Sequence, residues 1–172
     1  MTDYVAPLRD MQFVLNELVG LEKVAQLPGC EETTTELVNQ ILEEAGRFAS
    51  GVLAPLNQSG DKEGSSFANG AVRTPAGFKE AYRQFSEAGW NGLHFPPEFG
   101  GQGLPRIVST PVTEMWKAAN MSFSLCPLLT GGAIEALLLR GAEEHKQMFL
   151  PRMVEGKWTG TMNLTESQAG TD

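Results

Sequence analysis

The spacing of the apolar residues changes once along this chain, and that change limits its possible folds more than any other feature. As far as Val154, apolar residues recur every three or four positions in several separate stretches, which is typical of helices that bury one face. From Trp158 to Thr165 they alternate with threonine and asparagine, which is typical of a half-buried strand. A lone strand leaves its backbone donors and acceptors unpaired. The pattern therefore predicts a mainly α chain, in which a helical domain is followed by the first strand of a β domain that is missing from this sequence.

The strongest helical pattern runs from about Thr34 to Ala54, where one apolar stripe continues at the helical period. Thr33 and Glu36 have the spacing of a capping box, which predicts where this helix begins. Pro55 has no amide hydrogen to donate and is expected to end the helix or bend it.

The next segment is dominated by turn-forming residues. Residues 57–73 are rich in glycine, serine, asparagine and charge, which predicts a surface loop. Within it, Asn69-Gly70 favours the tight turn of a small hairpin. Thr74 and Pro75 then predict the N-cap and the first position of another helix.

The second half of the chain predicts three more helices. Residues 127–140 are apolar nearly all round, so we expect this helix to be buried, following a non-helical joint at residues 122–125. The other two helices are predicted at residues 105–119 and 142–154, and an irregular but ordered loop is predicted before them at residues 90–106. A short helix is also predicted near the N-terminus, at residues 7–19.

The charge and composition exclude some functions. The chain carries 13 Lys+Arg against 21 Asp+Glu, a net charge of −8, which argues against a nucleic-acid partner because phosphate binding needs a basic face. No apolar run approaches the roughly 20 residues of a membrane span. The N-terminal MTDYVAPLRD lacks the basic-then-apolar order of a signal peptide. These features favour a cytoplasmic protein with no membrane span.

The cysteines and histidines predict no metal site. Cys30 and Cys126 are too few for a disulfide scaffold and are expected to be free thiols in a reducing compartment. Together with His94 and His145, they show no spacing that suits a zinc site.

The C-terminal tail, from Met162 to Asp172, holds the residues of this sequence that could carry chemistry. Hydroxyls and backbone N–H groups at the end of a strand can bind a polar ring edge or a phosphate. Gly170 lets a ligand approach the backbone closely. On these residues alone, a solvated surface turn of threonine, glutamate and aspartate remains the plainer interpretation.

Several motifs in a fixed order resemble the acyl-CoA dehydrogenase family. They are FPPEFGGQG at residues 95–103, GAEEHK at 141–146, FLP at 149–151, EG at 155–156, LTE at 164–166 and AGTD at 169–172. The amphipathic stretch of residues 34–53 fits the opening helix of that family. Residues 4–18 resemble an N-terminal extension found on a longer bacterial branch of it. The resemblance therefore covers nearly the whole chain.

The resemblance implies a division of the chain and a fold. Residues 1–30 correspond to the helical extension, residues 31–156 to the α-helical N-terminal domain, and residues 157–172 to the start of the middle β domain. In the family a C-terminal four-helix bundle follows.

The resemblance also implies an activity. The family oxidises the Cα–Cβ bond of an acyl-CoA to a trans-2-enoyl-CoA, with a glutamate base removing the α proton and hydride passing to N5 of FAD. The expected partners are the acyl-CoA substrate, an electron-transfer flavoprotein and further copies of the chain in a homo-oligomer. The catalytic glutamate of the family falls outside these residues, so no catalytic residue is assigned; Glu98 and Glu166 are interpreted as solvated or capping residues.

Carried over position by position, the resemblance places flavin contacts in the tail. Thr165 corresponds to the hydrogen-bond donor to the flavin ring, and Thr171 also corresponds to a serine that touches acyl-CoA. Residues 123–129 are a candidate contact for the acyl chain. The implied FAD-binding residues are Met162, Asn163, Leu164, Thr165, Gly170 and Thr171.

Three departures from the family pattern affect this site. Ser167 stands where proline is usual, Thr171 replaces the serine, and Met162 stands where some relatives have an aromatic residue. Two other functions remain open: an acyl-CoA oxidase of the same fold, and a helical interaction module that lacks the chemistry.

Overall fold

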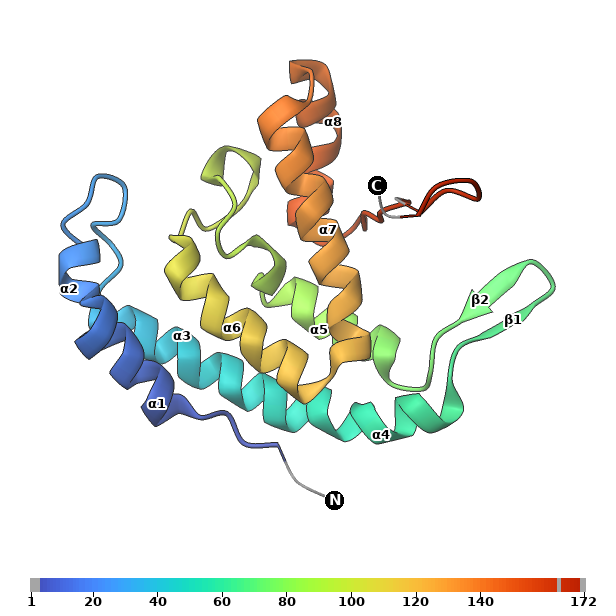
Figure 1. The fold of residues 1–172 in the computed structure, drawn as a ribbon, viewed down its shortest axis with the longest axis horizontal. Helices are drawn as coiled ribbons and strands as arrows, with labels where there is room; N and C mark the ends of the chain where they lie inside the picture. The colour runs from blue at the N-terminus through green and yellow to red at the C-terminus, as the bar shows by residue number, and fades with distance from the viewer. Residues whose placement is uncertain (1–3, 164, 171–172) are drawn as a thin grey trace.

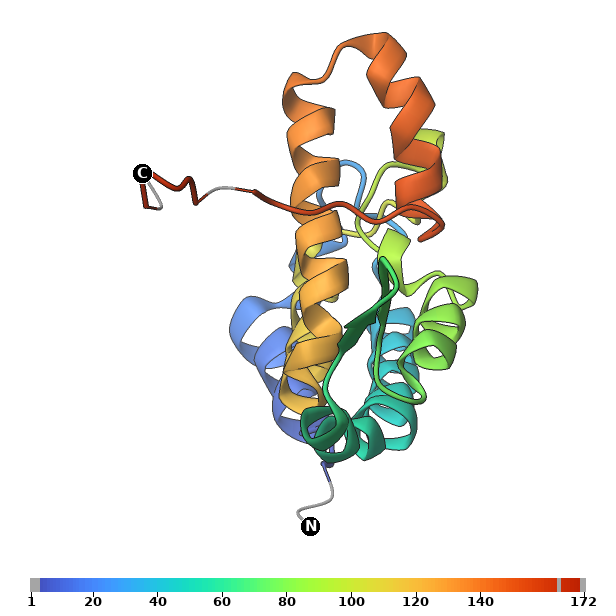
Figure 2. The same cartoon turned by 90° about the vertical axis from the view of Figure 1, so that its right-hand side faces the viewer.

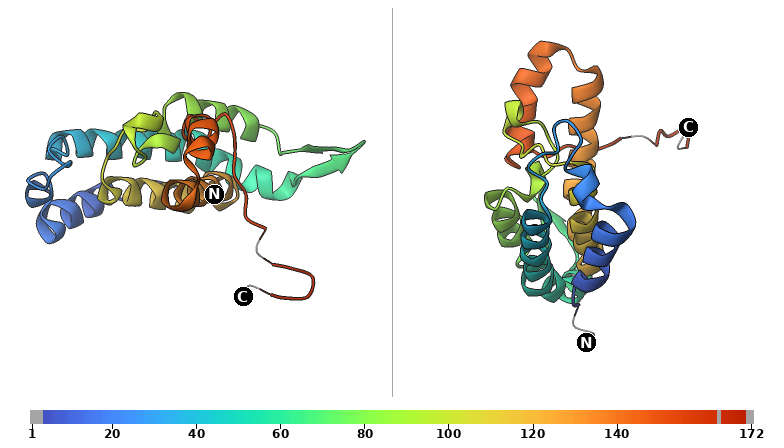
Figure 3. Two further views of the ribbon diagram at one scale, coloured as in Figure 1. Left: turned by 90° about the horizontal axis from the view of Figure 1, so that it is seen from above. Right: turned by 90° about the vertical axis from the view of Figure 1, so that its left-hand side faces the viewer.

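The computed structural model describes residues 4–163 and 165–170, and it is mainly α-helical (Figure 1). The mainly α fold class predicted from the sequence is therefore confirmed. Two short strands, β1 and β2, form a hairpin that projects from the helical body. Figures 2 and 3 show α7 (Met121–Arg140) and α8 (Glu143–Val154) as an antiparallel pair, which projects beyond the other helices at one end while the first half of α7 lies beside them.

The N-terminal residues form three short helical segments. These are α1 (Leu8–Phe13), the π-helical η1 (Val14–Val19) and α2 (Leu21–Val24). Gly20 separates the last two with a left-handed φ of 76°. Met11, Leu15 and Leu21 are buried in the main core, so this segment packs onto the helical domain.

The longest helical stretch consists of α3 (Thr35–Phe48), the π-helical η2 (Ala49–Leu53) and α4 (Ala54–Glu63). Thr34 is the N-cap, and its hydroxyl accepts a hydrogen bond from the Leu37 amide at 3.2 Å. The N-cap therefore lies one residue later than the predicted capping box, and Thr33 is buried instead.

Pro55 does not end this helical stretch, contrary to one of the two expectations. It occupies the first turn of α4, directly after the π-helical turn, in which the Ala54 amide bonds to the Ala49 carbonyl. A wider turn accommodates a residue that cannot donate, so the helix continues to Glu63. Residues 57–63 are therefore helical rather than part of the predicted loop.

The hairpin is formed by β1 (Ser66–Ala68) and β2 (Ala71–Arg73), paired antiparallel with Phe67 opposite Val72. Asn69 and Gly70 both have positive φ, at 53° and 75°, as a tight type I′ turn requires. The hairpin predicted from these two residues is confirmed.

Helix α5 (Phe78–Glu87) begins three residues after the predicted start. Gly77 has a φ of 87°, which interrupts the backbone between the Thr74-Pro75 turn and the helix. The loop that follows contains two 3₁₀ turns, η3 (Trp90–Gly92) and η4 (Pro97–Phe99). Backbone bonds across it, including Gln102 N to Gly92 O at 2.9 Å, confirm an ordered irregular loop.

Three helices complete the domain: α6 (Arg106–Ala119), α7 (Met121–Arg140) and α8 (Glu143–Val154). The non-helical joint predicted at residues 122–125 is wrong. Asn120 caps α7 through its side chain, so the helix begins at Met121 and takes Pro127 into its interior.

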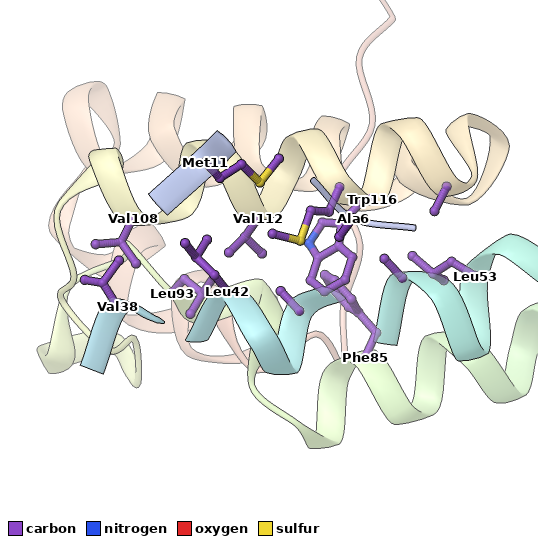
Figure 4. Close-up of a cluster of buried hydrophobic side chains, with 14 of the residues drawn as sticks. Ala6, Met11, Val38, Leu42, Leu53, Phe85, Leu93, Val108, Val112 and Trp116 are labelled. Atoms are coloured by element: carbon purple, nitrogen blue, oxygen red, sulfur yellow. The ribbon is translucent and has the colours of Figure 1, made fainter. Parts of the chain in front are cut away.

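The main core lies between α3, α5 and α6 (Figure 4). Trp116 is its centre, with its ring edge-on to Phe48 at 5.3 Å and to Phe85 at 6.0 Å between centroids. Such edge-to-face pairs stabilise a core beyond the area they bury. A second, smaller cluster around Ile134 and Leu150 joins α7, α8 and the 90–105 loop.

Residues 158–163 and 165, which the alternation predicts as a strand, have no regular secondary structure. They lead away from α8 as an extended segment that crosses α7 (Figure 2). A strand is defined by its pairing, and in the described residues no second strand pairs with it. Among the described residues, residues 158–163 and 165 are therefore neither helical nor part of a sheet.

Candidate functional site

The extended tail is attached to α7 at Gly160. The Gly160 amide donates to the Thr130 hydroxyl at 3.1 Å, and that hydroxyl donates to the Cys126 carbonyl at 2.8 Å. A Cβ on Gly160 would lie 2.5 Å from the Cβ of Ala133, so a side chain does not fit here. The contact fixes where the chain leaves the helical domain, two residues before the first implied flavin contact.

Four of the six implied flavin residues lie in the described part of the tail, and all four are exposed. Met162 is 57% exposed, and Asn163, Thr165 and Gly170 are exposed as well. Leu164 and Thr171, including the implied acyl-CoA contact of Thr171, lie outside the described residues. The described members of this set lie along a single segment that leads away from the helical body (Figure 1).

The residues that follow form a turn. The Glu166 amide bonds to the Ala169 carbonyl at 2.9 Å, and the Ser167 hydroxyl contacts the Gln168 side chain at 2.7 Å. Ser167 therefore permits a turn at the position where proline is usual. Both Glu98 and Glu166 are exposed, which fits solvated side chains.

The first half of α7 presents apolar side chains to solvent. Met121, Leu125 and Leu128 are 51%, 49% and 45% exposed, at positions that share one helical face. The prediction that this helix is buried is wrong. Apolar residues all round a helix indicate that its surface makes contacts, but they do not identify the polypeptide or ligand that it contacts. Within the candidate acyl-chain segment, Phe123 and Ser124 are buried and only the other side is accessible.

Beside this apolar face lies a cleft of about 760 Å³. It is lined by residues of α6, including Trp116, by residues of α7, and by Trp90 of the 90–106 loop. A Cβ built on Gly132 would meet nothing within 4 Å, so α7 has open space at this point. The cleft is largely apolar and of the size that small-molecule sites have.

A charged cluster closes one end of the cleft. Arg106 of α6 pairs with Glu135 of α7, and His94 Nε2 lies 3.5 Å from the same carboxylate. Burial and, to a smaller extent, the Arg106 guanidinium lower the pKa of His94 below its usual 6.5, while Glu135 acts in the opposite direction. The imidazole is therefore kept mainly neutral near pH 7.

In the described part of the chain, the cysteine thiols and the side chains that commonly bind metals form no further site. Cys30 and Cys126 are free thiols, and burial raises the pKa of Cys126. Among residues 4–163 and 165–170, no group of three His, Cys, Asp or Glu side chains could hold a metal ion.

Helix α7 is, by length and composition alone, able to cross a membrane. The sequence argument that no apolar stretch approaches a span is therefore incorrect for these 20 residues. The helix packs along α6 and α8, and Glu135 in its second half pairs with Arg106. These contacts give it a place within the helical domain.

The sequence interpretation overlooked Asn120, Thr130 and Gly160. Asparagine before an apolar helical stretch is a recognised N-cap signal, which could have revealed Asn120. The pairing of Gly160 with Thr130 joins residues 30 positions apart and has no local signal.

The family model for the acyl-CoA dehydrogenase N-terminal domain matches residues 35–157. The chain belongs to the acyl-CoA dehydrogenase family. This confirms the resemblance found in the motifs, and the matched residues include all of α3 to α8. The tail residues with the implied flavin contacts lie beyond the match.

Two curated relatives resemble the chain along nearly its whole length. The 3-methylmercaptopropionyl-CoA dehydrogenase of Ruegeria pomeroyi is 46% identical over 98% of the chain and 29% of its own length. A butyryl-CoA dehydrogenase of Syntrophomonas wolfei is 32% identical over 99% of the chain and 28% of its own length. The chain thus spans less than a third of these relatives.

Solved structures show the same fold. A chain from a study of the electron transferring flavoprotein of Acidaminococcus fermentans superimposes with a TM-score of 0.66 at 26% identity, over 81% of this chain and 34% of that one. Butyryl-CoA dehydrogenase from Megasphaera elsdenii gives the same TM-score and coverages at 24% identity.

Proposed function

We propose that the full-length protein is an FAD-dependent acyl-CoA dehydrogenase that converts an acyl-CoA to its trans-2-enoyl-CoA. The observation that carries this proposal is the family match over residues 35–157, joined to a tail that places Asn163 and Thr165 in the open directly after the helical domain. FAD, when bound, accepts the hydride from the β carbon. The base that takes the α proton is a glutamate outside these residues.

The donor set of the tail suits the polar edge of a flavin. The Asn163 amide and the Thr165 hydroxyl are exposed, and Gly170 has open space where a Cβ would lie. Backbone groups of an extended segment can add donors to the same edge. The role of these residues is to orient the isoalloxazine ring, and they form one side of a site that other parts of the protein complete.

The exposed face of α7 is proposed as a wall for the acyl chain. Leu125 and Leu128 offer apolar surface of the kind that gains free energy when a hydrocarbon displaces water from it. We also propose a short acyl chain, either straight or carrying a thioether. The support is the names of the relatives, which act on 3-methylmercaptopropionyl-CoA and butyryl-CoA.

The partner proposals follow the same reasoning. An electron-transfer flavoprotein is proposed to reoxidise the flavin, supported by a structural neighbour that comes from work on such a protein. A homo-oligomer and a cytoplasmic location complete the proposal.

The test uses the full-length protein purified with FAD. We expect a flavin absorbance band that bleaches when butyryl-CoA or 3-methylmercaptopropionyl-CoA is added without oxygen. Replacing Thr165→Val removes the hydroxyl at constant shape and should lower FAD occupancy, whereas Thr165→Ser should retain it. Thr161→Val is the matched control, because Thr161 is an exposed threonine on the same segment with no implied flavin contact.

Other outcomes identify the alternatives. A flavin band that bleaches but is restored by oxygen at the rate of turnover identifies an oxidase. A full-length protein with no flavin band, and no change in thermal stability with acyl-CoA, contradicts the enzyme proposal and leaves an interaction module.

A further inference from the structure

Asn120 is the single residue between α6 and α7, and its backbone forms hydrogen bonds with both helices. Its amide donates to the Trp116 carbonyl at 2.9 Å, which ends α6. Its carbonyl accepts from the Ser124 amide at 3.1 Å and from the Ser124 hydroxyl at 2.9 Å, within the first turn of α7. With a φ of −158° and a ψ of 94°, the residue turns the chain between two helical directions.

The Asn120 side chain adds a third element to this joint. Its Oδ1 accepts from the Phe123 amide at 3.0 Å, and its Nδ2 donates to the Leu53 carbonyl at 3.1 Å. Leu53 is the last residue of η2, two positions before Pro55. The side chain is 1% exposed, so these bonds are made away from water, where an unmade bond is costly.

The joint bears on the cleft because both helices that it connects line it, with Met121 and Leu128 among the lining residues of α7. Leu125 and Leu128 follow Asn120 closely on α7. At 1.5 Å of rise per residue, Leu128 lies about 12 Å along the helix from the joint, so a tilt of about 5° moves it by about 1 Å. A shift of that size at a wall changes which acyl chains fit.

We infer that Asn120 is a positioning residue that sets the direction of α7 and, through it, the acyl-chain selectivity of the enzyme. The inference rests on the proposed function, because it takes the exposed face of α7 as the acyl wall. Asn120 itself is buried and is not among the residues that line the cleft.

The experiment compares the full-length enzyme with two variants. Asn120→Ser keeps a hydroxyl that can cap the Phe123 amide but is too short to reach the Leu53 carbonyl. Asn120→Asp keeps the shape and the cap, but places an acceptor against the Leu53 carbonyl. The quantity measured is the ratio of kcat/KM for butyryl-CoA to that for octanoyl-CoA. We expect each variant to change this ratio by about tenfold relative to wild type.

The matched control is Thr34→Ala, which removes the N-cap of α3, a helix none of whose residues lines the cleft. It lowers thermal stability, as the Asn120 variants do, but should leave the ratio unchanged. If Asn120→Ser does not fold, the kcat/KM ratio of Asn120→Asp alone tests the inference. A wild-type enzyme that oxidises neither thioester overturns the proposed function and this inference together. An active wild type whose ratio is the same in every folded Asn120 variant overturns this inference alone.

Discussion

Gly101 is the residue at which the irregular loop is least able to accept a change. A Cβ at this position would lie 2.0 Å from the Phe95 carbonyl oxygen, which is backbone and cannot move aside independently. We expect Gly101→Ala to destabilise the protein by about 3 kcal/mol. The measurement is the thermal unfolding midpoint of the full-length protein.

The neighbouring Gly100 is the control for this prediction. Its φ is 88°, but a Cβ would meet nothing within 4 Å. Gly100→Ala should therefore show only the cost of a left-handed backbone, about 1 kcal/mol. Equal losses for the two variants would contradict the close contact at Gly101.

His94 gives the fold a dependence on pH. Burial and then Arg106 lower its folded pKa below the usual 6.5, so the unfolded chain binds the proton more readily. The stability contributed by the neutral imidazole is complete above about pH 6.5 and is lost as the pH falls through the folded pKa. We expect the unfolding midpoint of wild type to fall more steeply on acidification than that of His94→Gln. Parallel curves for the two proteins would refute this.

Single residues differ in how well the sequence reveals them. Asn69-Gly70 was predicted because both residues tolerate positive φ, a property of the residues themselves. The N-cap signal of Asn120 is local and was overlooked, whereas its bond to the Leu53 carbonyl joins residues 67 positions apart and has no local signal. The flavin contacts were assigned through the family resemblance, and the structure shows only that the described ones are exposed.

Two glycines of the longest helical stretch test how the elements pack. A Cβ on Gly60 would lie 2.5 Å from a ring carbon of Phe78 on α5, whereas a Cβ on Gly51 would meet nothing within 4 Å. We expect Gly60→Ala to destabilise by about 1–3 kcal/mol through overpacking. Gly51→Ala should stabilise by about 0.5–1 kcal/mol through helix propensity. Thermal unfolding midpoints that move in the same direction would contradict this contrast.

At the level of elements, the spacing of apolar residues predicted where most helices lie, but it predicted their first and last residues less well. Pro55 was expected to end or bend one helix and Pro127 to begin another, yet both lie inside helical stretches. Proline removes one donor, and a π-helical turn or a strong cap upstream allows the helix to continue. Such compensation depends on neighbouring elements, which a local rule does not contain.

For the whole molecule, the exposed apolar surface predicts how residues 1–172 associate with one another when they are expressed alone. Leu139 and Met148 are 74% and 59% exposed, in addition to the apolar face of α7. We expect this fragment to self-associate, which sedimentation velocity over a concentration series measures. Replacing Leu125 and Leu128 by lysine should reduce the association. A strictly monomeric fragment at high concentration would contradict this prediction.

The same fragment should bind FAD weakly or not at all. Its implied flavin residues lie on one extended segment, and one side of a site retains little of the binding free energy of the whole. Fluorescence titration with FAD measures this directly. Micromolar or tighter binding would show that the helical domain and tail already form a complete site.

The anchoring of Gly160 on Thr130 has a consequence for how such a protein tolerates changes in length. Met162 lies two residues beyond the Gly160–Thr130 hydrogen bond. Two residues of extended chain span about 7 Å, so the distance from this bond to Met162 cannot be much longer than that. One inserted residue between the two would exchange the faces of every later side chain in an alternating segment. Extra residues are better accommodated at the tip of the β1–β2 hairpin, which points into solvent and displaces nothing.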